Sequence, residues 1–277
     1  MRKILAIESG GIRAIISALI LSQIEKTTRR SASEEFDLIT GCGSGSILAI
    51  GLALGMRAED IVQYFQQNGK KVYRGWWLTA LLKRTALNAL LPDVMSADAL
   101  RFFLRDLLGP SAFADCRVPT ICVNSTWPTK TFESWRSQTG IQAAEVAALS
   151  ALSLREGYSY AYGRSLTSAK VRWPTEQLQL VHVGTGREDD LAPSNQGKLG
   201  WGRIVVPFLC QAHLQSQQDV LMSLHKHAYV QLNPSIGRRA APSDDASPGN
   251  LERLASLTRA YLEQEPVRLK ILSLVGG

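Results

Sequence analysis

The stretch that decides the fold runs from residue 36 to residue 55 and reads FDLITGCGSGSILAIGLALG. A short apolar segment precedes the glycine-rich turn GCGSGS (41–46), and a longer apolar segment follows it. The first segment has the length of a buried strand, and the second is apolar on nearly every face, as in a helix packed beneath a sheet. The sequence therefore predicts a strand, a tight turn and a helix, the arrangement in which many hydrolases hold a nucleophile.

The start of the chain repeats this unit. The segment KILAI (3–7) predicts a strand, Gly10 and Gly11 follow it, and residues 12–30 have apolar side chains at helical spacing. We expect the strand before GCGSGS to cover 34–40. Consecutive units of this kind predict a three-layer α/β/α sandwich with its functional loops at the carboxyl ends of the strands.

Further periodic segments continue the pattern. We expect helices over 57–73, 95–109, 208–224 and 248–264, and strands over 118–126, 129–137, 178–186 (ending in a glycine turn) and 228–234. The sequence has no internal repeat and no long linker. We therefore expect a single domain over 1–277.

Composition excludes several classes of protein. Hydrophobic residues make up 45% and charged residues 20%, as in globular proteins, and no apolar run approaches the ~18 residues of a membrane-spanning helix. The first residues read as a buried strand rather than a signal peptide. The four cysteines show no C-x-x-C spacing, and the four histidines form no ligand pattern with them. We expect a cytoplasmic protein with free thiols, without metal or cofactor, and with His182 as a satisfied core histidine.

The net charge of +7 is dispersed along the chain. Basic residues occur in several short groups without interleaved aromatic residues, so the sequence does not indicate a nucleic-acid partner. The dispersed charge predicts a solvated basic face or, as the alternative, a weak affinity for anionic surfaces.

Four stretches resemble patatin-like phospholipases over nearly the whole chain. The stretch 4–21 resembles the family's oxyanion loop, Asp-Gly-Gly-Gly-x-Arg-Gly, and 36–55 resembles its nucleophile elbow, Gly-Thr-Ser-Thr-Gly-Gly. Residues 180–189 resemble the strand and turn that follow the family's aspartate, and 243–264 resemble the C-terminal helix of bacterial members. The resemblance implies a patatin-like fold, related in layout to the α/β hydrolases, and identifies a bacterial patatin-like protein with degenerate motifs.

The family's chemistry needs a serine nucleophile, a carboxylate that acts as a base, and backbone N–H groups that stabilise the oxyanion. A serine hydroxyl is a weak nucleophile until a base takes its proton, and patatins use a lone aspartate as that base. The glycine loop directs N–H groups toward the oxyanion that develops during acyl transfer.

The chain departs from the family at the nucleophile and at the base. When Gly41 and Gly45 are aligned with the glycines of G-x-S-x-G, Gly43 occupies the nucleophile position. The second signature is best matched by EGYSYAYGRS (156–165), which places Glu156 at the aspartate and lacks the following Asn-Pro pair. The segment before Glu156 is also shortened relative to the family.

The oxyanion loop is altered in part. Gly10, Gly11 and Arg13 match the family signature, whereas its remaining positions are filled by Glu8, Ser9 and Ala14. The two glycines could hold an anion or merely permit the turn. For Arg13 we expect a structural ion pair with a carboxylate rather than a contact with substrate.

A one-residue slip of the elbow is the alternative. It would place Ser44 at the apex, with the small residues Cys42 and Ser46 on either side and Glu156 as base. In the simpler interpretation, Ser44 and Ser46 cap the following helix, and Cys42 points away from the site. An engineered Gly43 would explain the missing serine, but not the altered second signature.

Two functions follow from the resemblance. Because the nucleophile, the base segment and the oxyanion loop all differ from the family, we expect a non-catalytic protein that binds a lipid, an acyl group or a protein partner, with peripheral membrane contact. The alternative is an active phospholipase A-type acyl hydrolase that uses Ser44 and Glu156.

Overall fold

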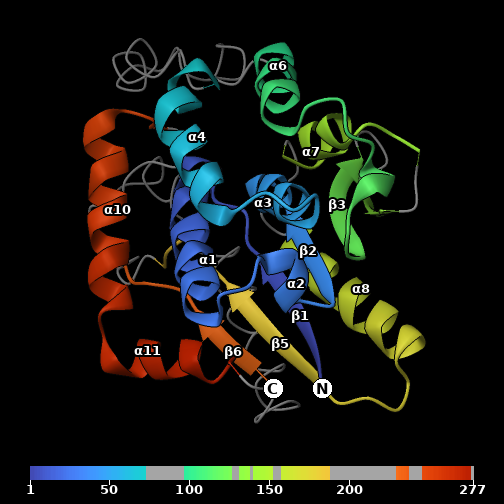
Figure 1. Ribbon diagram of the computed structural model, residues 1–277. Helices are drawn as coiled ribbons and strands as arrows, with labels where there is room; N and C mark the ends of the chain where they lie inside the picture. The colour runs from blue at the N-terminus through green and yellow to red at the C-terminus, as the bar shows by residue number, and fades with distance from the viewer. Residues whose placement is uncertain are drawn as a thin grey trace, which may run out of the picture.

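A single mixed sheet forms the centre of the molecule (Figure 1). The computed structural model describes residues 1–72, 97–126, 131–137, 140–151, 157–187, 229–236 and 245–275. Within these ranges the strand order is β4-β3-β2-β1-β5-β6. The strands are β1 (Arg2–Ile7), β2 (Leu38–Cys42), β3 (Thr120–Thr126), β4 (Thr131–Arg136), β5 (Leu178–Val183) and β6 (Tyr229–Leu232).

All neighbouring strands are parallel except β4, which pairs antiparallel with β3 at one edge. In this register Ile7 at the end of β1 is opposite Gly41 of β2 and Val183 of β5. The carboxyl ends of β1, β2 and β5 therefore lie level at the same edge of the sheet, where open α/β sheets hold their ligands.

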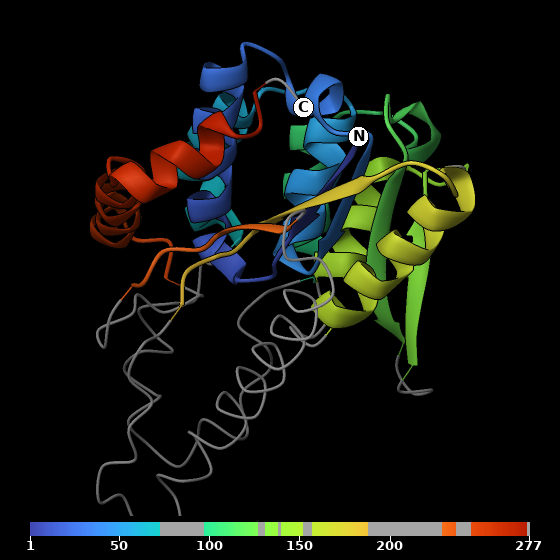
Figure 2. The same cartoon turned by 90° about the horizontal axis from the view of Figure 1, so that it is seen from below.

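Helices cover both faces of the sheet. They are η1 (Gly11–Arg13), α1 (Ala14–Thr28), α2 (Ala32–Glu35), α3 (Ser44–Ala53), α4 (Ala58–Val72), α6 (Ala97–Leu108), η3 (Phe113–Asp115), α7 (Ala143–Ala151), α8 (Gly157–Arg172), α10 (Pro248–Leu262) and α11 (Glu265–Leu272). Leu5 and Ile7 share one hydrophobic cluster with α1 and α3, while Ile4 and Ala6 share another with α8. Figure 2 shows the strands between α1 and α3 on one side and α8 on the other. The expected three-layer α/β/α sandwich is confirmed.

The expected elements are present wherever the structure describes them, with one correction. The segment 34–40 does not begin as a strand, because α2 covers its first two residues and β2 starts only at Leu38. Ser31 and Glu34 form a capping box in which each side chain bonds the other residue's backbone N–H, and this local signal starts a helix. The helix expected over 208–224 lies outside the described residues.

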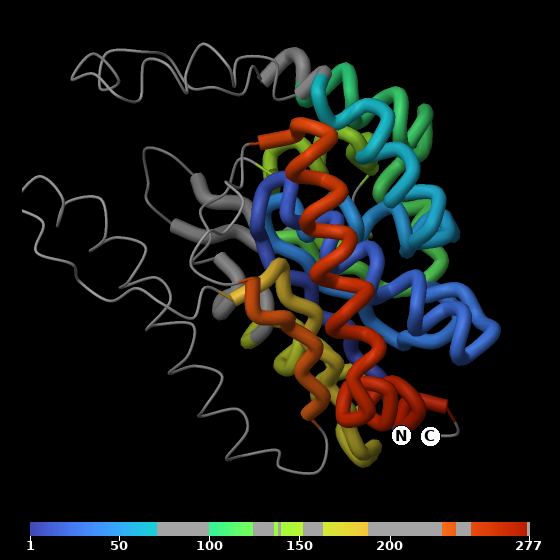
Figure 3. The backbone as a smooth tube through the Cα atoms, turned by 90° about the vertical axis from the view of Figure 1, so that its left-hand side faces the viewer, coloured from blue at the N-terminus to red at the C-terminus, as the bar shows by residue number. Residues whose placement is uncertain are grey.

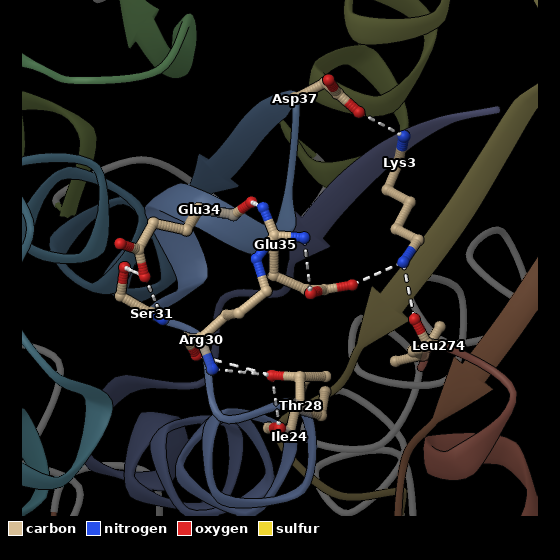
Figure 4. Close-up of polar contacts among 9 residues, drawn as sticks. All are labelled: Lys3, Ile24, Thr28, Arg30, Ser31, Glu34, Glu35, Asp37 and Leu274. Carbon is tan, nitrogen blue, oxygen red and sulfur yellow. Dashed lines mark hydrogen bonds and ion pairs between the residues drawn. The ribbon is translucent and has the colours of Figure 1, made fainter. Parts of the chain in front are cut away.

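The start of β1 and the turn after α11 contact each other at the edge of the sheet where β1 begins. Figure 3 shows α10 lying along α1 and the N and C ends close together. Lys3 is buried there, and its Nζ donates to Glu35 Oε1 at 2.5 Å and to the carbonyl of Leu274 at 2.6 Å (Figure 4). The Lys3 N–H also donates to Asp37 Oδ2 at 2.8 Å. One lysine therefore ties the start of β1 to α2 and to the C-terminal turn.

This buried ion pair gives a stability prediction. We expect Glu35→Ala to lower the free energy of unfolding by about 3 kcal/mol, because it leaves the Lys3 ammonium buried without its carboxylate. The matched control is Glu252→Ala, which breaks an ion pair with Arg259 whose side chains are 67% and 57% exposed and should cost less than about 1 kcal/mol. Urea unfolding measures both; equal effects of the two substitutions would contradict the prediction.

Candidate active site

Gly43 forms the apex of the turn between β2 and α3. Its backbone has φ +53° and ψ −134°, a conformation that a residue with a side chain adopts only under strain. A Cβ on Gly41 would stand 2.5 Å from the carbonyl oxygen of Gly45. A Cβ on Gly45 would stand 2.6 Å from the carbonyl oxygens of Ile7 and Glu8. The two flanking glycines are thus sterically required, and Gly43 lies between them at the apex.

The expectation that Ser44 and Ser46 cap α3 is wrong. Ser44 is the first residue of α3, and its Oγ accepts a hydrogen bond from the Gly10 N–H at 3.0 Å. Ser46 is fully buried, and its Oγ lies 2.5 Å from Ser150 Oγ, which in turn donates to the carbonyl of Val123. The first serine joins the elbow to the loop after β1, and the second joins α3 to α7 and β3.

The loop after β1 packs against the turn after β5. A Cβ on Gly10 would stand 2.2 Å from Thr185 Oγ1, so only glycine fits at this position. Thr185 Oγ1 donates to the carbonyl of Ser9 at 3.0 Å. Gly11 has φ +59° and begins η1, and Arg13 ends η1 with only 5% of its surface exposed. The structure therefore brings Gly10, Gly11 and Arg13 to the same edge of the sheet as the elbow.

Ser9 lies directly against the apex. An ideal Cβ on Gly43 would be 2.0 Å from Ser9 Oγ and 2.6 Å from Ser9 Cβ. The side chain of Ser9 therefore occupies the space that a side chain on residue 43 would need. The sequence shows this serine only as a departure from the glycines of the oxyanion loop. A signal for it is nevertheless present in the sequence: Ser9 stands where the family's oxyanion loop has glycine, and Gly43 stands where its elbow has serine.

A row of three polar side chains, Glu8, His182 and Tyr229, lies on the α8 face of the sheet next to Ser9. His182 Nε2 is 3.0 Å from Glu8 Oε1, and His182 Nδ1 is 2.8 Å from Tyr229 Oη. The imidazole is fully buried, so His182 is a core histidine as expected. Its Nδ1 is hydrogen-bonded to Tyr229, whereas its Nε2 only lies close to the Glu8 carboxylate without the geometry of a hydrogen bond. Cys42 packs into the hydrophobic cluster on the same face and carries a free thiol.

Glu156 lies outside the described residues, and α8 begins directly after it at Gly157. The segment matched to the family's second signature is therefore helical from its second residue onward. Within the described ranges, no group of three or more histidine, cysteine, aspartate or glutamate side chains is placed to hold a metal ion. No helix in those ranges is long and apolar enough to cross a membrane.

The contact between Gly45 and the end of β1 gives a second stability prediction. We expect Gly45→Ala to lower the free energy of unfolding by about 2 kcal/mol or more, because the new methyl group would collide with backbone that cannot rotate away. Gly163→Ala is the matched control: it lies exposed within α8, its Cβ would meet nothing within 4 Å, and alanine should stabilise that helix slightly. Thermal denaturation of both variants tests the contact. Similar losses of stability in the two variants would contradict it.

Two phospholipases are similar to this chain in sequence. The cGAMP-activated phospholipase of Pseudomonas aeruginosa (strain BWHPSA011 / Pa011) is 30% identical over 99 residues, which cover 32% of this chain and 30% of that protein. Calcium-independent phospholipase A2-gamma of Rattus norvegicus is 23% identical over 98% of this chain and 40% of its own length. The chain thus spans less than half of either relative.

The chain is also similar to a solved structure and matches a family model. The type III effector protein ExoU aligns with 98% of this chain and 53% of its own, at 10% identity and a TM-score of 0.49, too low to bear on the site. The family model of patatin-like phospholipases matches residues 5–163, which are more than half of the chain and include the end of β1, the loop after it and the elbow. The chain therefore belongs to the patatin-like phospholipase family.

Proposed function

We propose that this protein binds an acyl lipid at the carboxyl ends of its strands and does not hydrolyse it. The observation that carries the proposal is the position of Gly43. Gly43 stands at the apex of the elbow, between two glycines that are sterically required, and it carries no hydroxyl. We assign this apex to the nucleophile position of the family. Without an attacking group on the elbow, the covalent route of serine acyl hydrolases is closed there.

The oxyanion loop supports the same conclusion. An oxyanion hole needs backbone N–H groups that are aimed at the developing charge and not already engaged. The Gly10 N–H is engaged, because it donates to Ser44 Oγ. One amide that would stabilise an oxyanion therefore stabilises the elbow instead, which suits a binding protein better than a hydrolase.

The ligand class follows from the family and the charge. Patatin-like phospholipases act on lipids, and the net charge of +7 favours anionic headgroups. We propose a bacterial, cytoplasmic protein that contacts the membrane peripherally, with residues 1–277 forming one domain. A protein partner is the other ligand compatible with a non-catalytic role.

Phospholipase A-type hydrolysis with Ser44 as nucleophile and Glu156 as base is the second candidate. The observation that favours it is the contact between Ser44 Oγ and the Gly10 N–H, which places a hydroxyl against the loop that should hold the oxyanion. Ser44 is, however, only 6% exposed, and it lies one residue beyond the apex.

Hydrolysis distinguishes the two candidates. We expect the purified protein to release no fatty acid above the buffer rate from a fluorescent phospholipid or a short-chain ester, because the elbow carries no nucleophile. Ser44→Ala and Ser46→Ala are assayed beside it. Release that Ser44→Ala abolishes and Ser46→Ala preserves would replace the proposed function by the second candidate.

Vesicle binding tests the ligand class. We expect the protein to sediment with vesicles that contain anionic phospholipid more than with neutral vesicles. The difference should shrink as salt rises from about 0.1 M to about 1 M, because the screening length falls from about 10 Å to about 3 Å. Equal binding to both kinds of vesicle would contradict an anionic ligand.

A further inference from the structure

We propose that residues 9 and 43 share one side-chain position at the apex of the elbow, and that Ser9 fills it from the oxyanion loop. The distances carry this inference. A Cβ on Gly43 would lie 2.0 Å from Ser9 Oγ and 2.6 Å from Ser9 Cβ, both far below van der Waals contact. Two side chains cannot occupy this position together.

The backbone conformation of Gly43 does not by itself explain the missing serine. Nucleophile elbows hold a serine in a sharp, strained turn of this kind, and surrounding structure can support such strain. What excludes a side chain here is the occupant of the space next to Gly43. Ser9 is therefore the residue that keeps the elbow without a nucleophile.

Ser9 cannot easily move aside. A rotation about χ1 would displace its Oγ, but its Cβ moves only with the backbone. The peptide group after Ser9 is held at both of its polar atoms, because the Ser9 carbonyl accepts from Thr185 Oγ1 at 3.0 Å and the Gly10 N–H donates to Ser44 Oγ at 3.0 Å. Before Ser9, the Glu8 N–H donates to the carbonyl of Val183 at 3.1 Å. The 2.6 Å contact between the two Cβ positions would therefore persist.

The exchange has a consequence for the site. The hydroxyl that occupies the space of a side chain on residue 43 comes from the loop after β1, whereas Gly43 itself contributes backbone alone. A serine restored at 43 would collide with Ser9, so Gly43→Ser by itself does not rebuild the elbow of the family. Both positions must change together, as Ser9→Gly with Gly43→Ser, before the apex can hold a side chain on the elbow.

A double-mutant cycle in thermal denaturation tests the shared position. We expect Gly43→Ala to lower the melting temperature by about 5 °C or more, through overpacking and the positive φ. In the Ser9→Gly background the same change should cost half as much or less, because only the backbone strain remains. Ser9→Ala, which keeps the Cβ, should rescue less than Ser9→Gly.

Gly41→Ala is the matched control. Its methyl group would meet the backbone of Gly45 rather than Ser9, so its loss in melting temperature should be the same in both backgrounds. If Gly43→Ala does not fold at all, folding of the double variant is the expected rescue. Additive losses at 9 and 43, or a double variant that stays unfolded, would overturn the shared position.

The meaning of the shared position for catalysis rests on the proposed function, but the cycle needs no lipid. Failure of the protein to bind vesicles would leave the unfolding result unchanged. Hydrolysis by the unmodified protein that Ser9→Ala abolishes would contradict the non-catalytic function and would still support Ser9 as the hydroxyl at the apex. The two proposals can therefore fail separately.

Discussion

The backbone contact between the start of α3 and the end of β1 is the constraint on which the site depends. Gly45 approaches the carbonyl oxygens of Ile7 and Glu8 so closely that no side chain fits between them. This contact is possible because β1 and β2 are parallel neighbours that end level with each other. It brings the loop after β1 onto the elbow, so that the Gly10 N–H reaches Ser44 Oγ.

The same close approach is the basis of the proposed exchange between residues 9 and 43. The space at the apex is small, and a hydroxymethyl group can reach it from residue 43 or from residue 9. In this chain residue 9 supplies the group. In the proposed exchange, the hydroxyl at the apex comes from the oxyanion loop instead of the elbow, and the apex stays packed.

The sequence predicts the fold well and the site only in part. Repeated strand-turn-helix units specify the layers, because hydrophobic period and glycine turns are local signals. The early start of the strand at 34 was wrong because the Ser31–Glu34 capping box outweighs the apolar pattern. The contact of Ser9 with Gly43 could not be predicted from the sequence, because 34 positions separate the two residues and only the pairing of β1 with β2 brings them together.

A crystal structure of the protein with a bound fatty acid would examine the apex itself. If the oxyanion loop supplies the hydroxyl at the apex, the electron density will show the Ser9 side chain against the Cα of Gly43. It will also show a positive φ at Gly43 and the Ser44 Oγ within hydrogen-bond distance of the Gly10 N–H. Density that shows Ser9 turned away, with Ser44 at the apex and its Oγ against the fatty acid carboxylate, would contradict the exchange and favour a slipped elbow.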